Sequence, residues 1–207
     1  MLKILDDVCK PTKGSKYSAA IDLYAREDVV IGAGETVKVP LGVCIDLENN
    51  AELLPMVKWG IKKLKTDECK DHFIRAEIDK FSLNHYLQLE PRSSLRAKGL
   101  IAGTGIIDLD YKDEIMIILH NPIQYIVKAI DINKNEDYIE IDYLGSPTPR
   151  EDGIKVKYSS SFKIKKGDKI AQILLKEHKT YLMGIDTDDE RNGGFGSTDI
   201  WTDMKRL

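Results

Sequence analysis

Residues 114–119 read Glu-Ile-Met-Ile-Ile-Leu, and this run decides the class of fold. Apolar, mostly β-branched residues in a short unbroken run are typical of a strand that is buried on both faces. A second run, Lys-Ile-Ala-Gln-Ile-Leu-Leu at 169–175, has the same character. Further short strand-like runs, divided by glycines and a proline, lie at 20–25, 29–31, 36–39 and 41–47. Many short strands with turn residues between them predict an all-β sandwich or barrel.

The composition is that of an ordinary globular protein. The chain has 207 residues, 42% of them hydrophobic and 31% charged, which is enough for one good core. Its formal net charge of −3 gives no whole-chain attraction to nucleic acid or to an acidic membrane. No run approaches the roughly 20 apolar residues of a membrane span, and the first residues hold no signal-peptide stretch. We therefore expect a cytoplasmic protein with no membrane and no nucleic-acid partner.

The cysteines also favour the cytoplasm. Cys9, Cys44 and Cys69 are odd in number, far apart and in no CxxC pair. This pattern fits reduced thiols better than a disulfide framework or a zinc site.

Two segments depart from the pattern of short strands, and we expect a single domain, 1–207, that carries both as insertions. The first, about 49–86, is charged and partly helical. Four of its side chains recur at the spacing of one helix face: Ile74, Ile78, Phe81 and His85. The segment is too short for an independent core, so it should lie on the barrel. The second, about 123–161, holds polar strands around a glycine- and proline-rich turn and predicts an exposed β-hairpin.

Three loops combine residue types that suit a nucleotide. Pro91–Leu95 (PRSSL) joins an arginine to two hydroxyls, and a guanidinium can bind phosphate oxygens in a bidentate manner. Gly103–Tyr111 (GTGIIDLDY) joins two glycines to a pair of acids, one of which could polarise a water. Arg191–Thr198 (RNGGFGST) could close over a base and offer N–H groups to phosphates. Taken singly, each loop also has a purely structural explanation: a surface loop with a helix cap for the first, a hairpin with exposed acids for the second, and a flexible tail for the third.

In their order along the chain, these segments resemble the five motifs of the trimeric deoxyuridine triphosphatase (dUTPase) family. The matching segments are 19–25 (AAIDLYA), 91–100 (PRSSLRAKGL), 105–114 (GIIDLDYKDE), 167–172 (GDKIAQ) and 191–198 (RNGGFGST). The resemblance implies a jelly-roll-like dUTPase β-barrel and a homotrimer with shared active sites. It also implies hydrolysis of dUTP to dUMP and pyrophosphate, which keeps uracil out of DNA and supplies dUMP for dTMP synthesis.

By this resemblance, the third motif handles the attacking water, the sugar and the base. Asp108 would activate the water for attack on the α-phosphorus, as a general base. Tyr111 would pack under the deoxyribose and leave no room for a 2′-hydroxyl. Four further residues would line the nucleotide, three through their main chain at the uracil edge and one on the next strand: Gly105, Ile106, Ile107 and Met116.

The other motifs would hold the triphosphate and its Mg²⁺. Four side chains would bind phosphate oxygens: Arg92, Ser93, Ser94 and Gln172. The fifth motif would close as a lid, about 188–207, supplied by a neighbouring subunit. Its residues would be Arg191, Phe195 stacked on the uracil, and Gly196, Ser197 and Thr198 at the β- and γ-phosphates. The phosphates themselves would carry Mg²⁺, with Asp22 reaching the ion only through water.

Two alternatives stay open on the sequence alone. Related dCTP deaminases share the fold and part of the second motif, so the chain could be a deaminase or a bifunctional relative. The run from Asp108 to Tyr111 and the GGFGST tail favour the triphosphatase. In addition, the insertions could bind a regulatory protein. The basic run 58–65 (KWGIKKLK) could contact a partner or nucleic acid, but a solvated face of the insertion is the better explanation.

Overall fold

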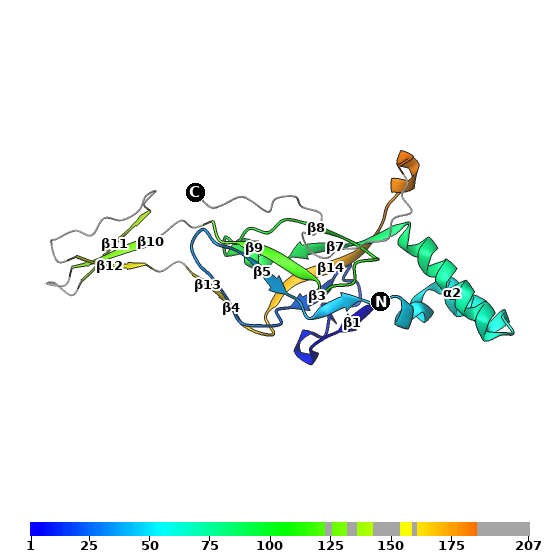
Figure 1. The fold of residues 1–207 in the computed structure, drawn as a ribbon. Coiled ribbons are helices and arrows are strands. Elements are labelled where there is room, and N and C mark those ends of the chain that lie inside the picture. Colours follow the sequence, from blue (N-terminus) through cyan, green and yellow to red (C-terminus); the bar gives the residue numbers. More distant parts are fainter. Residues whose placement is uncertain (123–125, 132–135, 143–153, 159–160, 186–207) are drawn as a thin grey trace.

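The computed structural model describes residues 1–122, 126–131, 136–142, 154–158 and 161–185, and between 126 and 158 it describes the main chain alone. The expected lid at 188–207 lies outside the described residues, and with it Arg191, Phe195, Gly196, Ser197 and Thr198. In the described residues strands form the body, and the longest helices gather at one end of it (Figure 1).

The strands of the body are β1 (Leu2–Ile4), β2 (Thr12–Lys13), β3 (Ile21–Tyr24), β4 (Val29–Ile31), β5 (Thr36–Pro40), β6 (Val43–Ile45), β7 (His85–Pro91), β8 (Gly105–Asp108), β9 (Met116–His120), β13 (Phe162–Ile164) and β14 (Lys169–Glu177). Three more strands are β10 (Ile126–Asp131), β11 (Glu136–Asp142) and β12 (Ile154–Tyr158). The α-helices are α1 (Pro55–Gly60), α2 (Asp67–Ser82) and α3 (Ser93–Ala97). The 3₁₀ helices are η1 (Asp7–Cys9), η2 (Glu48–Leu53), η3 (Ile61–Lys63) and η4 (Thr180–Met183).

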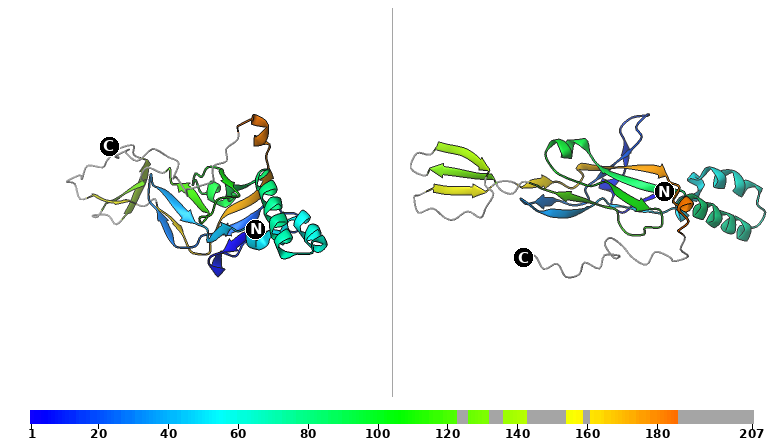
Figure 2. Two further views of the ribbon diagram at one scale, coloured as in Figure 1. Left: turned by 45° about the vertical axis from the view of Figure 1, so that its right-hand side comes forward. Right: turned by 90° about the horizontal axis from the view of Figure 1, so that it is seen from above.

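A five-stranded antiparallel sheet, in the order β2-β3-β14-β7-β8, forms the largest part of the barrel wall. Three antiparallel pairs complete the wall: β1 with β6, β4 with β13, and β5 with β9. Hydrogen bonds join these pieces where strands end. The Leu41 N–H donates to the Ile115 carbonyl at 3.0 Å, and the Ile115 N–H donates to the Val43 carbonyl at 2.8 Å. Two further views show the strands arranged around one interior (Figure 2).

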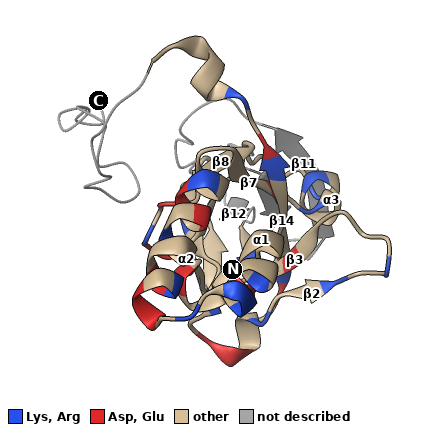
Figure 3. Ribbon diagram, turned by 90° about the vertical axis from the view of Figure 1, so that its right-hand side faces the viewer, with Lys and Arg blue, Asp and Glu red and all other residues tan. Residues whose placement is uncertain are grey.

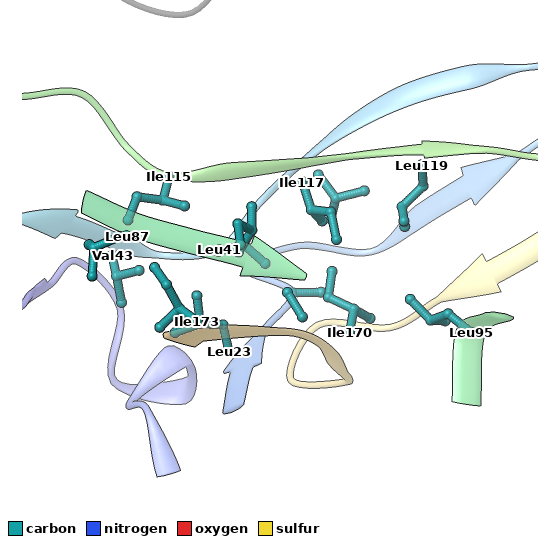
Figure 4. Packing of buried hydrophobic residues seen from close by; sticks show 14 of the residues in the cluster. Leu23, Leu41, Val43, Leu87, Leu95, Ile115, Ile117, Leu119, Ile170 and Ile173 are labelled. Atoms are coloured by element: carbon teal, nitrogen blue, oxygen red, sulfur yellow. The ribbon is translucent and has the colours of Figure 1, made fainter. Parts of the chain in front are cut away.

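Aliphatic side chains from all parts of the wall fill this interior (Figure 4). Leu23, Leu41, Ile117 and Ile170 are at most 1% exposed, and they come from four separate segments of the chain. Fully burying one such side chain contributes about 1.5–3 kcal/mol. The core therefore fixes the relative positions of the strands on which the motifs lie.

The expectation that 114–119 is buried on both faces is wrong. Ile117 and Leu119 are buried, but Ile118 between them is 42% exposed. Strand β9 pairs antiparallel with β5, where Ile118 lies opposite Lys38. One face of this pair packs against the core and the other face is exposed, so burial alternates along the strand.

The first insertion is partly helical, as expected, and α2 is its longest element. Thr66 caps this helix by accepting a hydrogen bond from the Cys69 N–H at 3.3 Å. Figure 3 shows charged residues of both signs on α2. The helix ends at Ser82, so the expectation that His85 shares its apolar face is wrong. His85 instead begins β7, with its ring stacked on Phe81 at 4.0 Å between centroids.

The insertion is attached to the barrel through its own small core. Ala51, Leu54 and Val57 are buried together, and Ile78 and Phe81 pack both against them and against the barrel core. Among the described residues no helix is both long and apolar enough to cross a membrane.

The second insertion contains a β-hairpin, as expected, but the strands that form it are not the two that flank the predicted glycine- and proline-rich turn. Strands β10 and β11 pair antiparallel as a hairpin, and β12 pairs antiparallel with the other edge of β10. The result is a three-stranded sheet in the order β11-β10-β12, which projects from the barrel in Figure 1. The expectation that the polar strands on either side of that turn pair with each other is therefore wrong, because β11 and β12 lie on opposite edges of β10.

Because Phe81 joins two hydrophobic clusters, Phe81→Ala should lower the free energy of unfolding by about 2–4 kcal/mol. Leu83→Ala is the matched control, since Leu83 is 67% exposed, and it should change stability by less than about 0.5 kcal/mol. Urea unfolding at one fixed protein concentration measures both. Equal effects of the two substitutions would show that the insertion is not anchored through Phe81.

Candidate active site

Asp108 is the last residue of β8, and Tyr111 lies just beyond the turn that follows it. The Tyr111 N–H donates to the Asp108 carbonyl at 3.1 Å and closes this turn. Asp108 is exposed, whereas Tyr111 is only 5% exposed and belongs to the barrel core. The turn thus presents a carboxylate at the surface while it anchors an aromatic ring three residues later.

Strand β8 is an edge strand of the five-stranded sheet. It pairs with β7, so one row of its peptide groups points away from the sheet. Ile106 is 73% exposed, Gly105 is half-buried, and the half-buried Ile107 packs on the core. Met116, also half-buried, begins β9 just beyond the same loop. These positions allow main-chain recognition of a planar ligand at the edge of the sheet.

Arg92 follows directly after the last residue of β7 and precedes α3. Its N–H donates to the Ile170 carbonyl at 3.0 Å, and its own carbonyl accepts from the Leu95 N–H at 3.0 Å. Leu95 is buried and fixes α3 to the core, while Ser93 and Ser94 in the first turn are exposed. Both hydroxyls are therefore at the surface, next to a main chain held at a strand end.

Asp22 holds two cations that belong to different motifs. Arg92 Nη1 lies 2.6 Å from Asp22 Oδ1, and Lys169 Nζ lies 3.2 Å from Asp22 Oδ2. The hydrogen bond to Asp22 is the main cause that raises the pKa of Lys169. Asp22 is only 8% exposed. Each of its oxygens already has a positive partner, so in this chain the carboxylate orients Arg92 and Lys169.

A polar row crosses the outer face of the sheet beside this pair. Gln172 on β14 lies opposite Asp22 on β3 and Glu90 on β7. Glu90 accepts hydrogen bonds from Gln88 at 2.7 Å and from Thr104 at 2.8 Å, and these bonds lower its pKa. Gln172 is half-buried in this row, next to the Asp22 that orients Arg92. The second and fourth motifs and Asp22 of the first are therefore brought together.

The third motif is not brought to the same place within one chain. Asp108 lies opposite Tyr86, near the start of β7, whereas Arg92 follows its end. Six residue steps along an extended strand span about 20 Å. A single copy therefore keeps the candidate base and the candidate phosphate-binding arginine on opposite ends of β7.

Four charged residues of this region were not predicted from the sequence: Arg26, Glu90, Glu114 and Lys169. Lys169 and Glu114 lie inside matched motifs, and this position in the sequence could have identified them as site residues. Glu90 and Arg26 carry no such signal, since each is recognised only from its side-chain partners. Arg26 Nη1 contacts Glu114 Oε2 at 2.8 Å, and Arg96 Nη2 contacts Glu90 Oε2 at 2.9 Å.

Two cavities lie near these elements. One of about 190 Å³ lies between α3 and the β13–β14 connection, with Ser94, Lys98 and Lys169 among its lining residues. A larger one of about 370 Å³ lies where the first insertion meets β7 and β14, lined in part by Phe81 and His178. The smaller cavity is therefore the one that adjoins the second and fourth motifs.

In the part of the chain that the structure describes, no group of three or more His, Cys, Asp or Glu side chains could hold a metal ion. The donor set of the site fits an ion that arrives on a polyphosphate, because Mg²⁺ usually keeps several waters and few protein ligands.

Known proteins with similar sequences and folds point to one family. A family model described as dUTPase matches residues 75–136, which include Arg92 and Asp108. The chain is 25% identical over 203 residues to the deoxyuridine 5′-triphosphate nucleotidohydrolase of Paramecium bursaria Chlorella virus 1, covering 96% of this chain and 95% of that protein. It is 28% identical over 205 residues to the protein of the same name from Clostridioides difficile, covering 95% and 94%.

A solved structure shows the same fold. The dUTPase of phage phi11 of S. aureus, a mutant described as revealing the coordination of a structural Mg(II) ion, superposes with a TM-score of 0.51. The match covers 86% of this chain and 90% of that chain at 17% identity. The all-β fold, the relatives that align along almost the whole chain, and the model match over the second and third motifs agree in identifying the dUTPase family as the one that this chain resembles.

Proposed function

We propose that the protein hydrolyses dUTP to dUMP and pyrophosphate. The observation that carries this proposal is the turn after β8, where the exposed Asp108 and the buried Tyr111 are fixed in one hydrogen-bonded loop. Relatives aligned along nearly the whole chain are named deoxyuridine 5′-triphosphate nucleotidohydrolases.

In the proposed reaction, Asp108 accepts a proton from a water that attacks the α-phosphorus, and pyrophosphate leaves. Tyr111 lies under the deoxyribose, where a 2′-hydroxyl would meet its ring. The outward peptide groups of Gly105 to Ile107 recognise the uracil edge, and Met116 lines the nucleotide. The anchoring of Tyr111 in the barrel core supports this role, because a steric filter works only when its position is fixed.

Arg92, Ser93, Ser94 and Gln172 bind the phosphates in this proposal. Asp22 supports Arg92 by holding one of its nitrogens at 2.6 Å, which leaves the rest of the guanidinium to face an anion. Lys169, the second partner of Asp22, adds a positive charge at the same place.

The active site is proposed to be composite, with Asp108 and Arg92 of one site coming from different copies of a homotrimer. The distance along β7 supports this, since one chain cannot bring the two residues together. A closed ring of three copies can repeat the same contact three times. The lid residues Arg191, Phe195, Gly196, Ser197 and Thr198 would close the site from a neighbouring copy.

Magnesium is proposed as the cofactor, bound to the phosphates of dUTP. The phi11 dUTPase described with a structural Mg(II) ion is a protein of the same fold. When bound, the ion neutralises phosphate charge and so favours attack by water. A water-mediated contact with Asp22 stays a prediction, and the two cations on that carboxylate favour its role in orienting Arg92.

A cytoplasmic location is part of the proposal, since Cys9, Cys44 and Cys69 are all free thiols. Added binding of a regulatory protein by the insertions is kept as a second function. The exposed Leu53, Met56 and Trp59 on the first insertion favour it, because large apolar side chains exposed together are typical of protein contacts.

A panel of nucleoside triphosphates tests the activity. Purified protein should release pyrophosphate from dUTP, with dTTP, dCTP and UTP slower by a factor of about 100 or more, and omission of Mg²⁺ should lower the rate. No ammonia should form from dCTP. Ammonia from dCTP without pyrophosphate from dUTP would instead establish the deaminase alternative.

Asp108→Asn should lower kcat for dUTP by about 10²–10⁴-fold, because the amide cannot take the proton from water. Its affinity for dUTP, measured by calorimetry, should change little. Asp110→Asn is the matched control from the same turn and should retain most of the turnover. If Asp110→Asn lost more turnover than Asp108→Asn, the base would be Asp110 and not Asp108.

Mixed trimers test the composite site. Asp108→Asn and Arg92→Gln should each be nearly inactive alone, but random trimers formed by co-refolding should recover up to about a quarter of the wild-type sites. The gain arises because some sites combine an intact Asp108 with an intact Arg92 from another copy.

Mixing Arg92→Gln with Gln172→Ala is the control for this experiment. Both defects lie in the same half of the site, so no combination of copies restores it. Recovery in the control, or none in the test mixture, would contradict the assignment of Asp108 and Arg92 to different copies.

A further inference from the structure

Glu114 forms a clamp at the exit of the loop that carries Asp108 and Tyr111. One carboxylate oxygen, Oε1, accepts a hydrogen bond from the Gly42 N–H at 2.7 Å. The other, Oε2, lies 2.8 Å from Arg26 Nη1. Arg26 follows β3, and Gly42 lies between β5 and β6, so one side chain ties three segments of the barrel together.

The clamp reaches Tyr111 through the main chain of Glu114. The Tyr111 hydroxyl donates to the Glu114 carbonyl at 3.3 Å, and the Tyr111 N–H is bonded to Asp108. The next residue, Ile115, is bonded through its own N–H and carbonyl to Val43 and Leu41. The end of the loop from Asp108 to Glu114 is thus held both by the side-chain contacts of Glu114 and by main-chain hydrogen bonds.

The partner that fixes the carboxylate is itself rigid. Gly42 has φ +65°, a conformation that favours glycine, and a Cβ at this position would lie 2.5 Å from Cys9. The direction of its N–H is therefore determined by the barrel. The Glu114 side chain is 20% exposed and that of Arg26 is 40% exposed, so solvent screens their ion pair only in part.

We propose that Glu114 is a positioning residue that sets the discrimination between dUTP and UTP. It does so by fixing Tyr111, whose ring is the filter against a 2′-hydroxyl in the proposed function on which this inference rests. The Arg26 guanidinium and the Gly42 N–H hold Glu114. Loosening the clamp lets the ring move away, which admits UTP and weakens the alignment of dUTP.

Kinetics with both nucleotides test the role of the clamp. Glu114→Ala removes both contacts, Glu114→Gln keeps an acceptor for the Gly42 N–H, and Arg26→Met removes only the ion pair. The ratio of kcat/KM for dUTP to that for UTP should fall about tenfold in Glu114→Ala and less in the other two. The loss for dUTP should appear mainly in KM. In the double variant Arg26→Met, Glu114→Gln, the ratio should fall no further than in the more impaired single variant, because both substitutions break the same ion pair.

Glu35→Gln is the matched control. Glu35 also binds a main-chain N–H through its carboxylate, that of Gly32 at 2.6 Å, but at the other end of the β5–β9 pair. Glu35→Gln should leave the ratio of kcat/KM for dUTP to that for UTP unchanged, even where it lowers thermal stability as much as the Glu114 variants do. An unchanged ratio in folded Glu114→Gln and Arg26→Met, or an equal fall in Glu35→Gln, overturns the inference. Absence of dUTP hydrolysis by the wild-type protein overturns the proposed function itself, so the two failures are distinguishable.

Discussion

The pairing of β7 with β14 on one side and β8 on the other determines the arrangement of the whole site. The pairing with β14 places Gln172 opposite Glu90, and the pairing of β14 with β3 places Asp22 on the other side of Gln172, where it contacts Arg92. The pairing with β8 places Asp108 beside Tyr86 at the opposite end. The length of one strand thus separates Arg92, the proposed phosphate-binding residue, from Asp108, the proposed base. Under the proposed function, a complete site therefore requires two copies of the chain to meet.

The ion pairs around Arg92, in the part of the sheet proposed to bind phosphate, follow from this arrangement. Arg92 and Lys169 approach Asp22 from different strands, and without a carboxylate between them the two cations would repel each other. A nearly buried carboxylate is costly unless it is paired, so the three groups stabilise one another. The guanidinium is consequently oriented before any substrate arrives. Part of the entropic cost of aligning a triphosphate is therefore met when the chain folds.

Much of this molecule could be predicted from the sequence, because short β-branched runs with turn residues leave few all-β alternatives. The motif positions could also be predicted, since each motif is contiguous. Contacts between distant segments could not. Ile118 lies in an apolar run but is exposed, because the pairing of β9 with β5 decides which face is covered. The cationic partners of Asp22 could not be predicted either, because they lie 70 and 147 positions away along the chain.

The place of the first insertion follows from the same constraint on β7. It joins β6 to the start of β7, where a longer connection costs little, since loop-closure entropy grows only slowly with length. Its attachment uses Phe81 and the stacked His85, one residue before the Tyr86 that pairs with Asp108. The end of β7 that carries Arg92 is bonded instead to β14 and α3. An insertion at this end therefore enlarges the protein beside the turn that carries Asp108, while it leaves the part of the sheet around Arg92, Asp22 and Gln172 intact.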